Sequence, residues 1–472
     1  MSALAGRSGR YLLLYGGALA LAVAAGAVLA YSETFGGNYG PYLLLGVLLG
    51  IAVAVAIVLQ WRLGALLLVA SLPFEATLTL GPLASAIKVL AILTFFSVAL
   101  ALLRDRRLFE RFSRLWQQPL AVAVLAFMLW VSVSFVWASY KGVALSATAT
   151  FVGVFGLMVV FGLLERRYLA LALAAFVFSA ALSVPAGYIL PVPEGSDMAV
   201  SGRFGPGGAG PNSYACLLAI AFFVAYFGLL RRHAIIAFLL APVFFYGIFA
   251  TASRTGLVAL VVTPLLALLV PRLAARLGWR LVPMYAVGLA AFAVIILVVP
   301  WVGTTRGESA AQRYTTLFQP TSEATWSGRW SIWQGALDVI SSHPILGVGA
   351  GNFAEFAMQD SAKVAAHSAA KGAVAGVAHN MFLGVASQLG IVGLILFLGM
   401  LFFAFKTILP IAQGSELGTG IFLGFIAAMF AGLTLTWEKY EIVYVLLGSI
   451  LALQLHYSAR GAPSPGKHEG FR

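Results

Sequence analysis

Two arginines and one histidine stand out as residues that could do chemistry in an otherwise apolar chain. Arg254 lies in the segment TASRTG, Arg329 lies in SGRW, and His379 directly precedes a long apolar run. A guanidinium offers paired N–H donors to a phosphate and never loses its charge. A histidine can accept a proton near neutral pH. These residue types fit the departure of a diphosphate, stabilised by arginines, while an imidazole deprotonates the attacking hydroxyl.

Each of these residues also has a simpler interpretation. Arg254 could be an interfacial anchor whose charged end reaches towards water. Arg329 could be a solvated charge beside a tryptophan, and His379 an interfacial histidine without chemistry. Arg203, in the segment GRFG, and Asn380, beside the histidine, are further candidates for binding the substrate, although Arg203 could equally be a solvated loop charge.

Metal and nucleotide sites find little support in the sequence. His379 has no partner ligand three or four residues later, and Cys216 is the only cysteine. The segment GVGAGN at 347–352 resembles a phosphate loop, but it lacks a preceding strand and a following Lys-Ser/Thr pair. We predict a tight turn there, followed by a short helix with Asn352 near its start. No metal and no cofactor are predicted.

The composition identifies the class of protein that must position these residues. The chain has 472 residues, of which 61% are hydrophobic and 10% are charged, and its mean hydropathy is +0.97. A soluble domain is closer to half apolar and a quarter charged. These values exclude a soluble globule, a disordered chain, a disulfide scaffold and a coiled coil. The sequence therefore predicts an all-α polytopic membrane protein.

Hydropathy predicts 12–14 transmembrane helices, because roughly 20 apolar residues cross a bilayer. The candidate spans are 11–31, 41–59, 63–80, 82–103, 119–138, 143–163, 168–190, 213–230, 234–252, 255–270, 281–302, 381–405, 418–436 and 440–456. We expect the first to be a retained helix and not a cleaved signal peptide. Two of the spans are short, and twelve crossings with a re-entrant pair are equally compatible.

The net charge of +13 would suggest nucleic acid in a soluble protein, but here it follows the positive-inside rule. Most Lys and Arg residues fall in alternate short loops when both termini are cytoplasmic, so nucleic acid is not a predicted partner. The predicted divisions are helices in 1–190, helices in 191–302 with a short periplasmic loop at 191–212, a large partly helical periplasmic loop at 303–378, helices in 379–456, and a cytoplasmic tail at 457–472.

Several smaller features complete the predictions. An amphipathic helix is expected from a Ser327 cap to His343-Pro344, with Trp330, Trp333, Leu337 and Ile340 on its apolar face. Lys88 is expected in the middle of a span, where it needs a partner such as Glu75. The polar segment WEKYE at 437–441 is interpreted as a structural ion pair, although it could also orient other groups.

Three segments in this order resemble the O-antigen ligase/polymerase superfamily. They are SRTGL at 253–257, GRWSIW at 328–333 leading to HPILGVGAGNF at 343–353, and AHNMFL at 378–383 with GIVG at 390–393. The resemblance covers about 203–405, and the earlier residues match only as generic membrane helices. The run from the arginine to the Gly-x-Gly-x-Asn-Phe segment is the most specific part.

The resemblance implies an enzyme of the bacterial inner membrane with a periplasmic active site. Arg254 and Arg329 would bind undecaprenyl diphosphate, Arg203 would add a less secure contact, and His379 would activate the acceptor hydroxyl. The implied partners are an undecaprenyl-diphosphate-linked glycan, a lipid A-core acceptor and membrane lipids. We favour an O-antigen ligase, and the resemblance implies that it needs no metal. We expect the reaction to invert the anomeric carbon, because one plausible base is present and no carboxylate nucleophile is evident. An O-antigen polymerase, a protein O-oligosaccharyltransferase and, less favoured, a polysaccharide transporter stay open, as does the oligomeric state.

Overall fold

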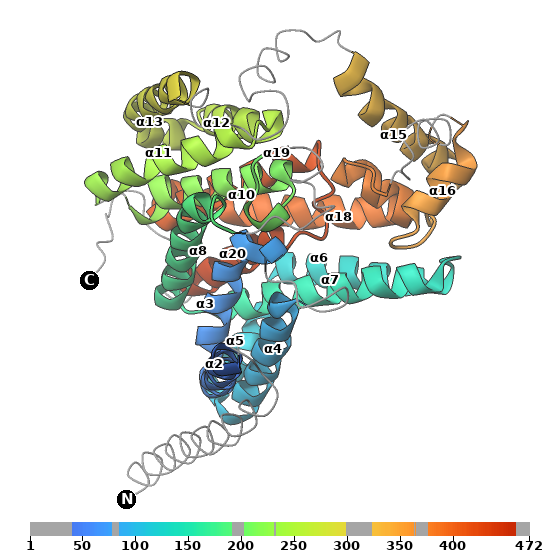
Figure 1. The fold of residues 1–472 in the computed structure, drawn as a ribbon. Coiled ribbons are helices and arrows are strands. Elements are labelled where there is room, and N and C mark those ends of the chain that lie inside the picture. Colours follow the sequence, from blue (N-terminus) through green and yellow to red (C-terminus); the bar gives the residue numbers. More distant parts are fainter. Residues whose placement is uncertain are drawn as a thin grey trace, which may run out of the picture.

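The computed structural model describes residues 40–77, 85–190, 203–230, 233–298, 323–362, 364 and 376–458, and within them the chain is built from helices (Figure 1). The helices of the first half are α2 (Gly40–Leu59), α3 (Trp61–Ser71), η1 (Leu72–Thr77), α4 (Ala86–Arg104), α5 (Arg106–Leu115), α6 (Pro119–Val133), η2 (Ser134–Val136), α7 (Lys141–Gly162), α8 (Arg166–Ala186), η3 (Pro206–Gly208) and α10 (Pro211–Phe223). Those of the second half are the π-helical turn η4 (Val224–Leu229), α11 (Ala234–Ala250), α12 (Arg254–Ala267), α13 (Pro271–Val298), α15 (Glu323–Ser342), α16 (Phe353–Asp360), α18 (Met381–Gly414), α19 (Glu416–Gly432) and α20 (Glu441–Ser458).

The predicted membrane spans coincide with these helices, which confirms the all-α polytopic fold class. The first span, 11–31, lies outside the described residues, and every later span falls at least partly on a helix. Among the described residues, 7 helices are long and apolar enough to cross a membrane. Shorter apolar helices accompany them, α12 and α19 among them, and such lengths suit segments that cross only with the help of their neighbours.

The core of the bundle lies around α10, α19 and α20. The apolar windows of α10 and α20 are 78% buried, whereas that of α4 is only 17% buried, so α4 lines the outside of the bundle. Small residues allow the closest approaches. Gly228 of η4 faces Gly420 of α19, where an added Cβ would lie 2.8 Å from the Gly228 Cα. Lipid tails are as apolar as the helix surfaces, so burying apolar side chains against each other gains little in a membrane. Close backbone packing therefore contributes much of the association between such helices.

The long helix α18 is broken at Gly390, and the break is where the large loop attaches. Gly390 has φ 66° and ψ −170°, a conformation essentially restricted to glycine. The freed carbonyls of Ser387 and Gln388 accept the backbone N–H groups of Val348 (3.1 Å) and Gly349 (2.8 Å). The indole of Trp130 donates to the next carbonyl, that of Leu389, at 3.0 Å. The interruption is tolerated because loop and side-chain donors satisfy the unpaired backbone.

The segment 347–352 forms the predicted turn, and α16 follows it as the predicted short helix. Gly347, Gly349 and Gly351 all have positive φ. The buried side chain of Asn352 does not cap α16. Its Oδ1 accepts the Tyr140 N–H at 2.8 Å, and its Nδ2 donates to the Ala350 carbonyl at 3.1 Å. The turn therefore joins α18 to the loop before α7.

The amphipathic helix of the large loop exists as α15, but its predicted start is wrong. It begins at Glu323 and not at a Ser327 cap, although it ends at Ser342 as expected. Its buried face carries Ile332, Ala336 and Val339, which pack with α16 and the start of α18. Two residues of the predicted apolar face are exposed, Trp330 at 57% and Leu337 at 54%. Helix α15 packs through the side that carries the small residues Gly335 and Ala336. An added Cβ at Gly335 would lie 2.2 Å from the side chain of Val364, so only a small residue allows this approach.

A helix that hydropathy did not predict, α5, connects α4 to α6. Asp105 caps it by accepting the N–H groups of Arg107 (2.9 Å) and Leu108 (3.3 Å). Arg111 turns inward and donates to the carbonyls of Leu164 (2.8 Å) and Ala452 (3.4 Å). Leu164 follows the end of α7 and Ala452 lies within α20, so the guanidinium connects α5 to both of these helices. The segment is too basic and too short for a span, which is why the hydropathy pattern passed over it.

Candidate functional site

A network of polar side chains connects Arg203 to the turn before α12. The guanidinium donates from Nε to the Thr251 carbonyl and from Nη2 to Asn212 Oδ1, both at 2.9 Å. The same Asn212 oxygen accepts the hydroxyl of Ser253 at 3.0 Å. Arg203 thus fastens the loop before α10 to the end of α11. Its predicted substrate contact stays a prediction.

The turn before α12 directs Arg254 to the positive end of that helix. Ala252 adopts φ 50°, a left-handed conformation that is unusual for a residue with a Cβ. Ser253 then caps α12, because its hydroxyl accepts the Gly256 N–H at 3.2 Å. Arg254 is therefore the first residue of α12 and is half-buried. The guanidinium and the N-terminal dipole of α12 both favour an anion at this position.

Arg329 lies in the same electrostatic neighbourhood as Arg254. Burial lowers the pKa of the Arg329 guanidinium, and the positive charge of Arg254 lowers it further. The two arginines come from α15 and α12, which are far apart in the sequence. Two partly buried cations repel each other, so their proximity is stabilised when an anion lies between them. The two arginines are therefore close enough for their charges to interact.

His379 lies at the start of α18 in a constrained backbone. Its φ is 49°, and its N–H donates to Thr436 Oγ1 at 3.2 Å. Asn380 caps α18 by accepting the N–H groups of Phe382 (2.9 Å) and Leu383 (3.1 Å). The Asn380 Nδ2 donates to the Leu433 carbonyl at 3.0 Å. Asn380 thus has a structural role in aiming the histidine, and its predicted substrate contact stays a prediction.

The segment 433–436, between α19 and α20, connects the start of α18 at His379 to the start of α12 at Arg254. Thr434 hydrogen-bonds to Thr255, the residue after Arg254, at 2.8 Å. Two residues later, the Thr436 hydroxyl accepts the backbone N–H of His379. Consequently α12 and α18 both begin against this segment, with Arg254 and His379 at their starts. The arrangement suits a diphosphate held by the arginines beside a hydroxyl that faces the imidazole.

Comparison with known proteins places part of the chain beside a known family. Residues 235–398 match the family model described as O-antigen ligase. This segment is therefore similar to the O-antigen ligase family. The match confirms the superfamily predicted from the sequence, and it indicates a ligase-type or polymerase-type enzyme that acts on lipid-linked glycans. Arg254, Arg329 and His379 lie inside the matched residues, whereas Arg203 precedes them. No curated protein matches the chain.

Outside the matched residues 235–398 lies a buried carboxyl group that the sequence interpretation missed. Glu438 is only 2% exposed, and its Oε2 has no hydrogen-bond partner. Burial raises the pKa of Glu438 to about 7, against the smaller opposing effects of its own backbone N–H, the charge of Lys439 and a hydrogen bond with Gln388. The predicted ion pair in 437–441 is wrong for this carboxylate, because the described residues place no cationic group within salt-bridge distance of it.

The position of Glu438 connects it to the broken helix. An added Cβ at Gly384, in the first turn of α18, would lie 3.4 Å from Glu438 Oε1. Gln388, one turn further on, donates to the Gly384 carbonyl at 2.8 Å and accepts the Gly351 N–H at 2.6 Å. Next to Glu438 in the chain, Trp437 stacks on Tyr440 with ring centroids 4.7 Å apart. A glutamate between aromatic residues was the available signal, but its burial depends on tertiary packing.

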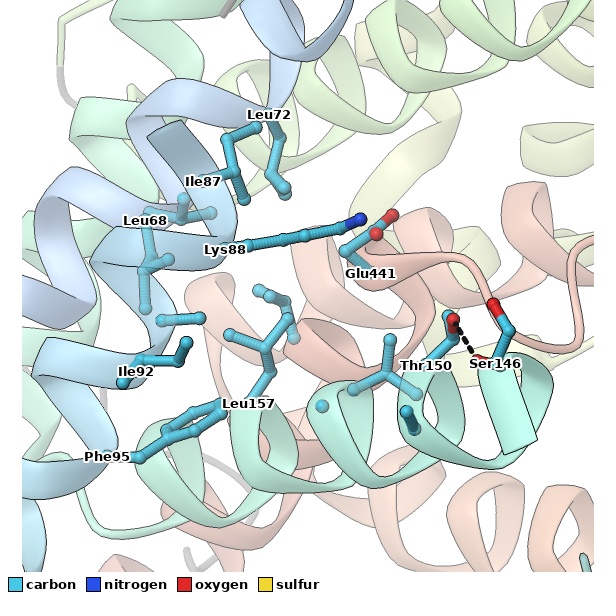
Figure 2. Close-up of a pocket in the computed structure, with 16 residues that line it drawn as sticks. Leu68, Leu72, Ile87, Lys88, Ile92, Phe95, Ser146, Thr150, Leu157 and Glu441 are labelled. Atoms are coloured by element: carbon cyan, nitrogen blue, oxygen red, sulfur yellow. Dashed lines mark hydrogen bonds between the residues drawn. The ribbon is translucent and has the colours of Figure 1, made fainter. Parts of the chain in front are cut away.

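A pocket of about 380 Å³ opens between α3, α4, α7 and α20 (Figure 2). Its walls are mostly apolar, and Figure 2 shows Lys88 reaching across it towards Glu441. Lys88 is in the first turn of α4, where its N–H donates to the Ser85 hydroxyl at 3.3 Å, and not in the middle of a span as predicted. The charges of Lys88 and Glu75 also influence Glu441. The pocket thus has one charged end and an apolar body.

Proposed function

We propose that this protein transfers O-antigen glycan from undecaprenyl diphosphate to lipid A-core at the periplasmic face of the bacterial inner membrane. The observation that carries the proposal is that the segment 433–436 contacts the starts of both α12 and α18, where Arg254 and His379 lie. The charge of Arg254 also acts on Arg329. The predicted topology, with both termini cytoplasmic, puts this end of the bundle in the periplasm. The family match supports a substrate in which a lipid carries the glycan.

The proposed reaction is a single displacement at the anomeric carbon. His379 accepts the proton of the acceptor hydroxyl as that oxygen bonds to the anomeric carbon. The bond from this carbon to the diphosphate oxygen breaks at the same time, and undecaprenyl diphosphate leaves with the electron pair. Arg254 and Arg329 stabilise the negative charge that develops on the leaving group. Attack from the opposite side inverts the anomeric configuration, and neither a metal nor a cofactor is required.

The pocket beside Lys88 suits the hydrocarbon part of the donor. It is lined by Leu68, Ile92, Phe95, Gly153 and Leu157 among others. Its charged end includes Glu441. Glu441 comes shortly after the segment 433–436, where Thr436 accepts the backbone N–H of His379. A polyprenyl chain that leaves the diphosphate site along this segment would reach apolar walls without entering water.

Filling that pocket tests the placement of the chain. A Cβ added at Gly153 meets no atom within 4 Å, so Gly153→Leu should fold normally while occupying the cavity. We expect an increase of about tenfold in the KM for the lipid-linked donor, since ~1.4 kcal/mol of binding corresponds to that factor. Gly399→Leu is the matched control, because Gly399 of α18 also meets no atom within 4 Å and does not line the pocket. Equal donor KM values in both variants would exclude the pocket.

The reaction itself is tested with purified protein and a lipid-linked glycan, offered either lipid A-core or a second lipid-linked repeat. Extension of lipid A-core supports the ligase, whereas extension of the lipid-linked repeat identifies a polymerase. His379→Ala should abolish transfer while binding of the lipid diphosphate persists. His343→Ala is the matched control, because His343 instead faces Phe356 and Asp360. Full transfer by the His379 variant would refute the assigned base.

Two further measurements test the roles of the cations. Arg254→Lys should impair transfer, because an ammonium loses the paired donors of a guanidinium. Wild-type turnover of that variant would instead identify Arg254 as a simple anchor. Transfer should continue in excess chelator. Loss of activity that a single divalent ion restores would contradict the metal-independent mechanism.

A further inference from the structure

A second pocket, of about 460 Å³, lies at the opposite ends of the helices from the arginine and histidine site. Four helices form it: the start of α6, the start of α13, the last turns of α18 and the end of α20. It is lined by Pro119, Arg272, Phe403, Lys406, Thr407, Pro410, Ile411, Gln413, Gly414, Gln454, Tyr457 and Ser458. The predicted topology puts all of these helix ends at the cytoplasmic surface of the membrane.

The charge of this pocket has one sign. Arg272 and Lys406 both line it, and its lining includes no carboxylate among the described residues. Arg272 Nη1 donates to Gln413 Oε1 at 3.2 Å, which holds the guanidinium at the wall. The nearest acidic residue along α18 and α19 is Glu416, which has interactions of its own and does not line the pocket. Two cations without a carboxylate between them favour an anionic ligand.

The polar groups between the cations match a phosphate joined to a glycerol. Thr407, Tyr457 and Ser458 bring hydroxyl groups that can donate to phosphate oxygens. The Oε1 of Gln454 is buried without a hydrogen-bond partner, so it can accept from a hydroxyl group of a ligand. An unsatisfied buried acceptor is costly, and a hydroxyl-bearing ligand would remove that cost.

The remaining wall is apolar and is suited to hydrocarbon. Phe403, Pro410 and Ile411 of α18 contribute to it, together with Pro119. A free anion would gain nothing from these residues, whereas a lipid would place its glycerol and first acyl carbons against them. Basic pockets between transmembrane helices on the cytoplasmic side characteristically bind anionic lipid headgroups.

We propose that this pocket binds the phosphodiester headgroup of an anionic glycerophospholipid of the cytoplasmic leaflet, through Arg272 and Lys406. Such a lipid would hold the ends of α6, α13, α18 and α20 together. Helix α18 begins directly after His379 and Asn380, so the lipid would stabilise the half of the bundle that carries the proposed base. The binding does not depend on the glycan that the protein transfers.

The test compares purified protein in phosphatidylcholine nanodiscs with and without phosphatidylglycerol. Wild type should show a higher apparent Tm with phosphatidylglycerol and should retain one such lipid in native mass spectrometry. Lys406→Gln removes one cation that makes no hydrogen bond or ion pair with the described residues, so it should fold normally. We expect it to reduce lipid retention about tenfold and to lose most of the Tm shift. Arg272→Gln with Lys406→Gln should abolish both effects.

The matched control removes two other arginines from the same predicted face. Arg106 and Arg107 lie on α5, and the side chain of Arg106 is 92% exposed. The double change of these two residues to Gln should leave lipid retention and the Tm shift unchanged. An equal loss in this control would identify a diffuse charge effect and overturn the proposal. Stabilisation of detergent-solubilised protein by inorganic phosphate alone, to the same extent as by the lipid, would identify a free anion as the ligand and would also overturn it.

Discussion

The interruption of α18 at Gly390 allows the sharpest test of how the fold positions the site. Gly390 is the only residue inside α18 with a non-helical backbone, and any side chain added there would meet the backbone of Ile345. Gly390→Ala is therefore expected to displace the segment that follows α15. Because α15 carries Arg329 and α18 begins beside His379, that displacement should separate the predicted phosphate ligand from the predicted base.

The expected cost follows from the contacts at the break. The positive-φ conformation costs a non-glycine residue about 1–3 kcal/mol. Three backbone hydrogen bonds also depend on the register, namely those to Ser387 and Gln388 and the bond from Ile391 to Pro344 (2.9 Å), and each contributes about 1 kcal/mol. We therefore expect the free energy of unfolding to fall by about 4–6 kcal/mol, a large part of the stability of an ordinary protein.

The assay follows apparent Tm and glycan transfer in parallel for the purified variant. Gly399→Ala is the control, since it places the same methyl group in the same helix where no atom lies within 4 Å. The control should change stability by no more than about 1 kcal/mol. If Gly390→Ala unfolds on extraction, it can be compared with its control in native membranes by protease protection of the large loop. Equal stability and transfer in the two alanine variants would refute the assigned role of the break.

Further outcomes are expected at three other positions. The side chain of Asn352 bridges Tyr140 and Ala350. Asn352→Ala should lower the free energy of unfolding by about 2–3 kcal/mol, because the Tyr140 N–H loses its acceptor. An unchanged Tm would contradict this. Burial raises the pKa of Glu438 from 4.5 to about 7, so its contribution to stability is fully present below pH 4.5 and is lost as the pH rises through 7. Glu438→Gln should therefore be more stable than wild type at pH 8, by on the order of 3 kcal/mol, and indistinguishable at pH 4.5; an equal Tm difference at both pH values would exclude titration of this group. Asn212→Ala should lower transfer, because it releases both Arg203 and Ser253, and unaltered transfer would show that this network does not position Arg254.

The sequence by itself determined the class of the protein and most of its helices. Span length and hydropathy are local properties, since a segment crosses the bilayer only if its own residues are apolar for long enough. The order of a few polar segments was also enough to identify the superfamily and its candidate residues, Arg254, Arg329 and His379. Arg254 and His379 lie at helix starts and Arg329 lies within α15. Polar residues such as these are easily recognised in an apolar chain.

Tertiary structure alone decided how those residues are joined. The hydrogen bonds from Thr434 to Thr255 and from His379 to Thr436 connect segments that are distant in the chain. The buried face of α15 and the burial of Glu438 are likewise set by neighbours. In a chain that is apolar almost everywhere, hydropathy does not distinguish a surface that faces lipid from one that faces another helix. Close packing of small residues makes that distinction, and it exists only once the helices have assembled.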